Sequence, residues 1–113
     1  MTLVCMNEDV LRQFDLFLDL KQENKLFVKF SYLDDFSGLK EFVISYQTLI
    51  GESFVEVIRY DSSLKENLHV HELFHLKSKK VFLGGAPDMD LLIRLKDQLE
   101  KNWRKYLLKY KER

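Results

Sequence analysis

The chain has 113 residues, of which 46% are apolar and 32% are charged, a composition typical of globular domains and unlike that of disordered chains. Its formal net charge is zero and it has one cysteine, Cys5, which excludes an intrachain disulfide. We therefore predict one domain over residues 1–113, and the lone cysteine favours a reducing, cytoplasmic location.

No apolar run approaches the roughly 20 residues of a membrane-spanning helix, so no membrane partner is predicted. The charges are nevertheless unevenly distributed. Residues 1–56 carry 5 Lys/Arg against 10 Asp/Glu, and residues 57–113 carry 13 against 8. From Arg94 onward there are 8 basic and 3 acidic residues, which fits either a nucleic-acid surface or, more commonly, a solvated helix face.

Period-two alternation of apolar and polar residues predicts two strands at residues 14–21 and 26–33, joined by a polar turn at 22–24. Residues 7–13 fit either a helical turn or a loop. A turn at 34–38 leads to a third strand at 41–50, and Gly51 with Glu52 separates it from a fourth strand at 53–60.

The sheet continues beyond the fourth strand. Residues 61–67 are polar and predict a loop, residues 68–76 predict an extended segment, and residues 77–80 predict a turn. A short edge strand is predicted at 81–83, and Gly84 and Gly85 end the sheet.

A long helix is predicted at the C-terminal end. It begins after Pro87, where Asp88 or Asp90 can cap the first free N–H groups. Apolar residues recur at spacings of three and four and form one stripe that should pack on the sheet: Leu92, Leu95, Leu99, Trp103, Tyr106 and Tyr110. The predicted fold is α+β, an antiparallel meander of five to six strands packed against one long C-terminal helix.

All three histidines fall within seven positions, at His69, His71 and His75. If residues 68–76 are extended, the three side chains point to one face of the sheet. The opposite face would then receive apolar side chains that look like core, namely Val70, Phe74 and Leu76.

The preceding strand divides in the same way. Arg59 and Asp61 would share a face with Val55 and Val57, and the other face would hold Phe54, Ile58 and Tyr60. If the two strands are antiparallel neighbours, Arg59 and Asp61 come near His69 and His71. The register decides whether the four share a face, because a slip of one residue reverses the answer.

Three roles suit this group of residues. In the first, His69 and His71 act as general acid and base in RNA cleavage, because the pKa of histidine lies near neutral pH, and Arg59, or Lys65 in the loop, stabilises the charged transition state. In the second, His69, His71 and Asp61 bind a divalent metal ion. In the third, the residues form a polar surface without catalytic function.

The segment from Phe54 to His71, which reads FVEVIRYDSSLKENLHVH, resembles a family of small prokaryotic proteins, the TumE-like toxin components of toxin–antitoxin pairs. Those proteins share a VEVxRYD stretch, a short variable loop, an HxH or H-R-acidic motif, and a helix with a WxxY-like pattern, here Trp103 to Tyr106. The loop at 62–68 departs from the family in lacking glycine. The resemblance implies a growth-inhibiting toxin that acts on RNA, with an antitoxin as partner.

The leading hypothesis is thus a toxin-like protein that acts on RNA through His69 and His71, with Arg59 and Asp61 in support, and without a cofactor. The matching positions of the resemblance are the same four residues. The rival hypothesis is a non-enzymatic interaction module, with a homodimer or an antitoxin contacting the open face of the sheet.

Overall fold

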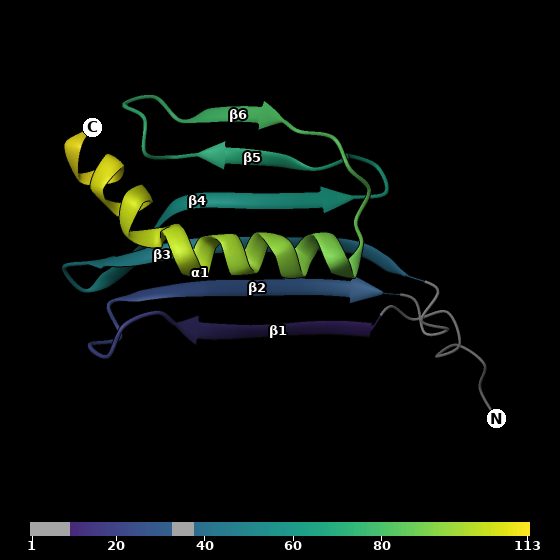
Figure 1. The fold of residues 1–113 in the computed structure, drawn as a ribbon, viewed down its shortest axis with the longest axis horizontal. Helices are drawn as coiled ribbons and strands as arrows, with labels where there is room; N and C mark the ends of the chain where they lie inside the picture. Colours follow the sequence, from purple (N-terminus) through teal and green to yellow (C-terminus); the bar gives the residue numbers. More distant parts are fainter. Residues whose placement is uncertain (1–9, 33–37) are drawn as a thin grey trace.

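The computed structural model describes residues 10–32 and 38–113, which form one antiparallel sheet and one helix (Figure 1). The strands follow one another in the sheet in the order β1-β2-β3-β4-β5-β6, and the helix α1 crosses one face of it, where it contacts β3 and β4. The α+β meander closed by a C-terminal helix is therefore confirmed. The elements are β1 (Val10–Phe17), β2 (Asn24–Tyr32), β3 (Leu39–Ile50), β4 (Ser53–Ser63), β5 (His69–Glu72), β6 (Lys79–Phe82) and α1 (Met89–Glu112).

The helix begins and packs as its sequence predicts. The Asp88 carboxylate accepts a hydrogen bond from the backbone N–H of Leu91 at 2.9 Å, which makes Asp88 the N-cap. Leu92, Leu99 and Trp103 are the buried positions of its stripe. The Trp103 ring packs edge-on against Tyr46 with centroids 6.0 Å apart, so this tryptophan anchors the helix to the sheet. Although α1 has 24 residues, no helix among the described residues is apolar enough to cross a bilayer.

The core lies between the helix and the sheet. Strand register places Val28, Ile44, Tyr60 and Val70 side by side on four neighbouring strands, and all four are buried. The predicted core positions Val70 and Phe74 are confirmed, and Tyr60 is buried as well. Because side chains alternate between faces along a strand, this row fixes which residues of β4 and β5 point away from the helix.

The turn between β1 and β2 explains why β1 ends four residues earlier than predicted. The Asp19 carboxylate accepts hydrogen bonds from the backbone N–H groups of Glu23 and Asn24, both at 3.0 Å, and thereby closes the turn before β2. The Asn24 side chain in turn donates to Asp19 at 3.0 Å and accepts from the buried Tyr46 hydroxyl at 2.6 Å. Side-chain capping, which alternation does not reveal, thus sets the length of this hairpin.

A β-bulge interrupts the pairing of β3 with β4. Tyr46 pairs with Ile58 but Gln47 pairs with Glu56, so Val57 has no partner. Val57 and Ile58 are both buried, and the residues before the bulge alternate in the opposite phase. Phe54 therefore lies on the face of Arg59, with the Lys25 ammonium 4.3 Å from its ring centroid. The predicted faces of Phe54, Val55 and Val57 were wrong for this reason.

Other boundaries also differ from the sequence predictions. Residues 10–13 belong to β1 rather than to a helical turn or loop, residues 61–63 extend β4, and β6 spans Lys79–Phe82 instead of residues 81–83. The extended segment predicted at 68–76 ends at Glu72. The break at Gly51 is confirmed, with a φ of 64° that favours glycine. Residues 7–9, Cys5 and most of the predicted turn at 34–38 lie outside the described residues.

Candidate functional site

The face of the sheet opposite the helix carries two rows of polar side chains on β4, β5 and β6. Arg59 pairs with His71, which pairs with Lys80. Asp61 pairs with His69 in the adjacent row. The prediction that Arg59 and Asp61 come near His69 and His71 is confirmed, and the register places all four on one face.

Asp61 is the centre of this group. Its Oδ1 contacts Nε2 of His69, and its Oδ2 lies 3.3 Å from Nε2 of His71. The Nε atom of Arg59 donates a hydrogen bond to the same Oδ2 at 3.1 Å. One carboxylate therefore holds two imidazoles and a guanidinium, and we refer to Asp61, His69 and His71 as the histidine–aspartate cluster.

His69 is the buried member of the cluster, with 3% of its surface exposed. Its Nδ1 lies 3.1 Å from the carbonyl oxygen of Asn67, and its ring packs against His71 and Phe82 with centroids 4.9 and 5.5 Å away. A carbonyl oxygen only accepts hydrogen bonds, so Nδ1 must carry the proton. In the neutral ring, Nε2 then presents a lone pair toward Asp61.

His71 is more accessible, with 22% of its side chain exposed. Burial lowers the pKa of His71, and the positive charge of Arg59 lowers it further, although Asp61 acts in the opposite direction. The imidazole is consequently neutral at neutral pH. A neutral imidazole can accept a proton or bind a metal ion.

Acidic side chains hold the two cations that flank His71. Arg59 donates a hydrogen bond to Glu56 at 2.8 Å, and Glu56 accepts a further one from the Ser45 hydroxyl at 2.5 Å. On the other side, the Lys80 ammonium contacts Glu66 at 2.5 Å, and this hydrogen bond lowers the pKa of the Glu66 carboxyl. The arrangement fixes the direction of the Arg59 guanidinium.

Sequence reasoning missed Lys80, Glu56 and Glu66. Lys80 was predicted to lie in a turn, whereas β6 begins at Lys79 and makes Lys80 the direct neighbour of His71. Glu56 joins this face only because of the bulge at Val57. For Glu66 the signal in the sequence is weaker, which is that an acidic residue lies three positions before His69.

His75 does not belong to the cluster, so its predicted place on the same strand face was wrong. β5 ends at Glu72, and the chain turns before His75. The His75 side chain is 42% exposed and pairs with Glu72 at 3.0 Å. Leu76, predicted as core, is 84% exposed for the same reason.

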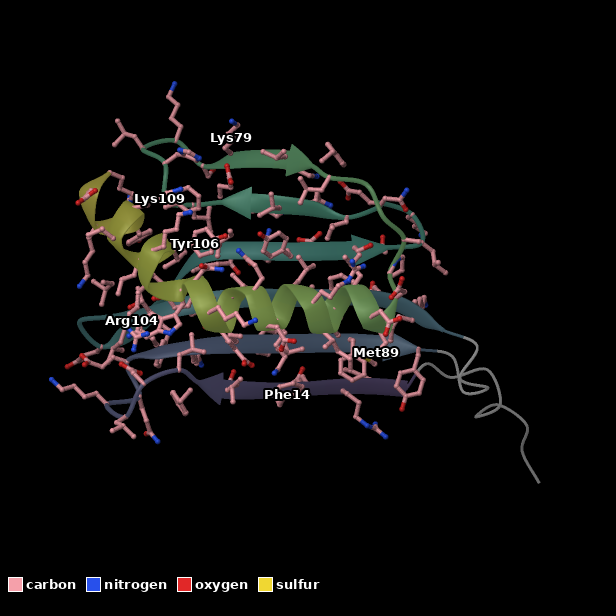
Figure 2. The ribbon with its side chains drawn as sticks, in the orientation of Figure 1. Phe14, Lys79, Met89, Arg104, Tyr106 and Lys109 are labelled. Carbon is pink, nitrogen blue, oxygen red and sulfur yellow. The ribbon has the colours of Figure 1, made fainter. Side chains whose placement is uncertain are left out.

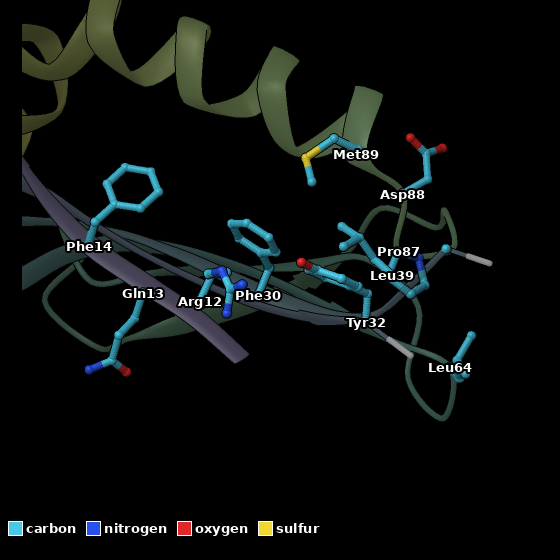
Figure 3. Close-up of a pocket in the computed structure, with 11 residues that line it drawn as sticks. Arg12, Gln13, Phe14, Phe30, Tyr32, Leu39, Leu64, Pro87, Asp88 and Met89 are labelled. Atoms are coloured by element: carbon cyan, nitrogen blue, oxygen red, sulfur yellow. The ribbon is translucent and has the colours of Figure 1, made fainter. Parts of the chain in front are cut away.

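Two other surfaces lie on the helix side of the sheet. The basic residues of α1, among them Arg104 and Lys109, lie along the helix (Figure 2), and this helix packs on the face of the sheet opposite the cluster. A groove of about 860 Å³ lies between the start of α1 and the strands β1 and β2 (Figure 3). It is lined by Phe14, Phe30 and Met89 among others, and contains none of the four predicted site residues.

The cluster has the composition of a metal-ligand set. Asp61, His69 and His71 each offer one ligand atom, and these atoms all lie within 4.8 Å of one another. Two imidazoles and one carboxylate suit divalent transition metals.

Residues 10–113, which include every element from β1 to α1, match the model of a family described as a domain of unknown function, DUF7718. The chain belongs to this family. No curated protein and no solved structure matches it. The description of DUF7718 assigns no activity, so the resemblance to TumE-like toxins stays a prediction, and the function has to be argued from the cluster.

Proposed function

We propose that the protein cleaves RNA phosphodiester bonds at the sheet face that carries the histidine–aspartate cluster, as a toxin-like component of a prokaryotic toxin–antitoxin pair. One observation carries the proposal: the accessible, neutral His71 lies between two cations, Arg59 and Lys80, in one row across three strands. A base next to positive charge is what the cleavage of a phosphate ester requires.

The two cations suit the substrate. A phosphodiester carries one negative charge, and further negative charge develops on its oxygens as the 2′-oxygen of RNA attacks the phosphorus. The Arg59 guanidinium, 35% exposed, can contact such an oxygen while its Nε remains bonded to Asp61. Lys80, 40% exposed, supplies a second positive charge on the other side of His71.

The cluster then provides the base that accepts the proton of the 2′-hydroxyl group. Sequence reasoning gave the acid and the base to separate histidines. In-line attack places these two groups on opposite sides of the phosphorus, yet the Nε2 atoms of His69 and His71 both face Asp61. The cluster therefore acts as one unit on the attacking side, and the leaving oxygen takes its proton from solvent.

The direct test is RNA cleavage by the purified chain. His71→Ala and His69→Ala should each lower the rate by about 100-fold or more, the usual cost of removing general acid–base catalysis. His75→Ala is the matched control, because His75 lies outside the cluster, and it should cleave at the wild-type rate. DNA of the same sequence should not be cleaved, since it lacks the 2′-hydroxyl group. Wild-type rates in the His71→Ala protein would refute the proposal.

The biological role and the partners are proposed from the resemblance. Expression of the wild-type chain in bacterial cytoplasm should arrest growth, an antitoxin should relieve the arrest, and His71→Ala should abolish it. The rival interaction module predicts no cleavage and a homodimer. Light scattering separates a monomer of 13.6 kDa from a particle of twice that mass.

A further inference from the structure

We propose that Asp61, His69 and His71 bind one divalent transition-metal ion, such as Zn²⁺, and that a water molecule on this ion supplies the base for RNA cleavage. The inference rests on the proposed function for its second part only. Metal binding itself follows from the geometry of the cluster.

The ligand atoms of the cluster converge on one point. Ligand atoms about 2.0–2.2 Å from a tetrahedral ion lie roughly 3.3–3.6 Å apart. Nε2 of His71 lies 3.3 Å from Oδ2 of Asp61, and the three ligand atoms of the cluster all lie within 4.8 Å of one another. All three can contact one ion once side-chain rotation shortens their separations from within 4.8 Å to about 3.6 Å or less.

His69 carries its proton on Nδ1, which also favours a bound cation. Because Nδ1 donates to the carbonyl oxygen of Asn67, Nε2 directs its lone pair toward the negatively charged carboxylate of Asp61. These two electron-rich groups repel each other. A cation must lie between them. A proton satisfies this one contact, whereas a metal ion satisfies Asp61, His69 and His71 at once.

The surroundings of the ligands are those of a metal centre. Histidine ligands typically donate their second ring nitrogen to a backbone carbonyl, as His69 does to Asn67, and ligating carboxylates are themselves hydrogen-bonded, as Oδ2 of Asp61 is to Arg59. Glu56 offsets the positive charge of Arg59 beside the ion. Three protein ligands leave a position open for water, which is typical of catalytic rather than structural zinc sites.

The chemistry balances without a further reactant. A metal ion lowers the pKa of its bound water to about 7, so metal-bound hydroxide is available at neutral pH. The hydroxide accepts the proton of the 2′-hydroxyl group and becomes water. The 2′-oxygen forms a bond to phosphorus, the bond from phosphorus to the 5′-oxygen breaks, and the 5′-oxygen takes a proton from solvent. The products are a 2′,3′-cyclic phosphate and a free 5′-hydroxyl group.

The experiment is a metal titration of the full chain after treatment with a chelator. Calorimetry with Zn²⁺, and visible absorption with Co²⁺ as a spectroscopic probe, should give one ion per chain. His71→Ala and Asp61→Asn should weaken binding by more than about 100-fold, because even the loss of an outer-shell partner typically costs about 10- to 100-fold. Arg59→Gln should fall within that smaller range, and His75→Ala should bind like the wild type.

Circular dichroism of each variant tests whether it is folded, and His71→Ala is the safest variant because its side chain is partly exposed. Absence of stoichiometric binding by the folded wild-type chain would overturn the inference. Equal weakening by His75→Ala would overturn it too, since the ion would then lie elsewhere.

The outcomes also separate the inference from the proposed function. Cleavage that stops on chelation and returns with Zn²⁺ supports both. Cluster-dependent metal binding without RNA cleavage supports the metal site and refutes the proposed function. Full cleavage by metal-free protein that binds no ion supports the proposed function and overturns the inference.

Discussion

Replacement of Tyr46 by phenylalanine tests whether a buried polar contact holds the first hairpin to the core. Tyr46 is completely buried, and its hydroxyl donates to Oδ1 of Asn24 at 2.6 Å. The substitution keeps the ring, and therefore the edge-on packing against Trp103. It removes one hydrogen bond and leaves the Asn24 oxygen without that donor.

The expected loss is set by the second effect, because the cost of an unpartnered buried atom already includes the lost hydrogen bond. A hydrogen bond contributes about 0.5–1.5 kcal/mol net, and a buried polar atom left without a partner costs about 1–3 kcal/mol. Asn24 is 6% exposed, so little water can replace the missing hydroxyl. We expect Tyr46→Phe to lower the free energy of unfolding by about 1–3 kcal/mol.

Urea denaturation followed by tryptophan fluorescence is the suitable assay. Trp103 is the single tryptophan of the chain and is buried against Tyr46, so its emission reports the separation of the helix from the sheet. The midpoint should fall with an unchanged slope, which is the signature of a change in stability alone.

A double-mutant cycle assigns the loss to the contact itself. Asn24→Ala alone should destabilise by more, because it also removes the hydrogen bond to Asp19. The double variant should lose less than the sum, with a coupling energy of about 1 kcal/mol. Tyr110→Phe is the control, because Tyr110 lies only partly buried on the helix and should change stability by no more than about 0.5 kcal/mol. A Tyr46→Phe protein as stable as this control would refute the reasoning.

Three further substitutions test the fold. Leu99→Ala removes a side chain with no exposed surface and should cost about 2–5 kcal/mol in thermal or urea unfolding, whereas Leu108→Ala, 58% exposed on the same helix, should stay near the wild type. Asp88→Ala removes the N-cap and should cost about 1 kcal/mol in the same assay. Desolvation raises the pKa of Asp19, but hydrogen bonds from Asn24 and Glu23 outweigh it and leave the pKa below the ordinary value of 3.8. The stability that Asp19 contributes is therefore present above pH 3.8 and is lost as the pH falls through its lower folded pKa. The wild type should be more stable than Asp19→Ala at neutral pH, and this difference in the free energy of unfolding should disappear in strong acid. Urea unfolding at each pH measures the difference. A difference that is unchanged in strong acid would contradict the role of the ionised carboxylate.

The helix was the most predictable part of the fold because its signals are local. Apolar spacing and the cap at Asp88 act within one or two turns, and both are visible in the sequence. Strand existence was also predictable from alternation, but strand ends were not. The Asp19 side chain caps the turn that ends β1 early, and β5 ends at Glu72, so contacts within turns interrupt the strands where the apolar pattern alone would continue them.

The candidate site was predictable only where alternation continues without interruption. His69, His71, Arg59 and Asp61 lie on stretches of β4 and β5 with no bulge, so their common face followed from the period of two once the register was known. Glu56 lies on the other side of the bulge from Arg59 and Asp61, and no residue type in this segment predicts a bulge. The tautomer of His69 depends on a carbonyl two residues earlier in the chain, and only the three-dimensional structure shows this contact.

The bulge at Val57 has a consequence for how substitutions along β4 are tolerated. A bulge adds one residue and thereby shifts the alternation of side chains between the two faces of the sheet. Positions of β4 that accept polar residues should therefore be even-numbered before Val57 and odd-numbered after it. If the same residues alternated without the bulge, the two halves of the strand would share a single phase. Either the Arg59 side or the Glu56 side would then turn toward the helix, and a charge would have to enter the core. The unpaired valine thus keeps two acidic residues and an arginine on the same side of one strand.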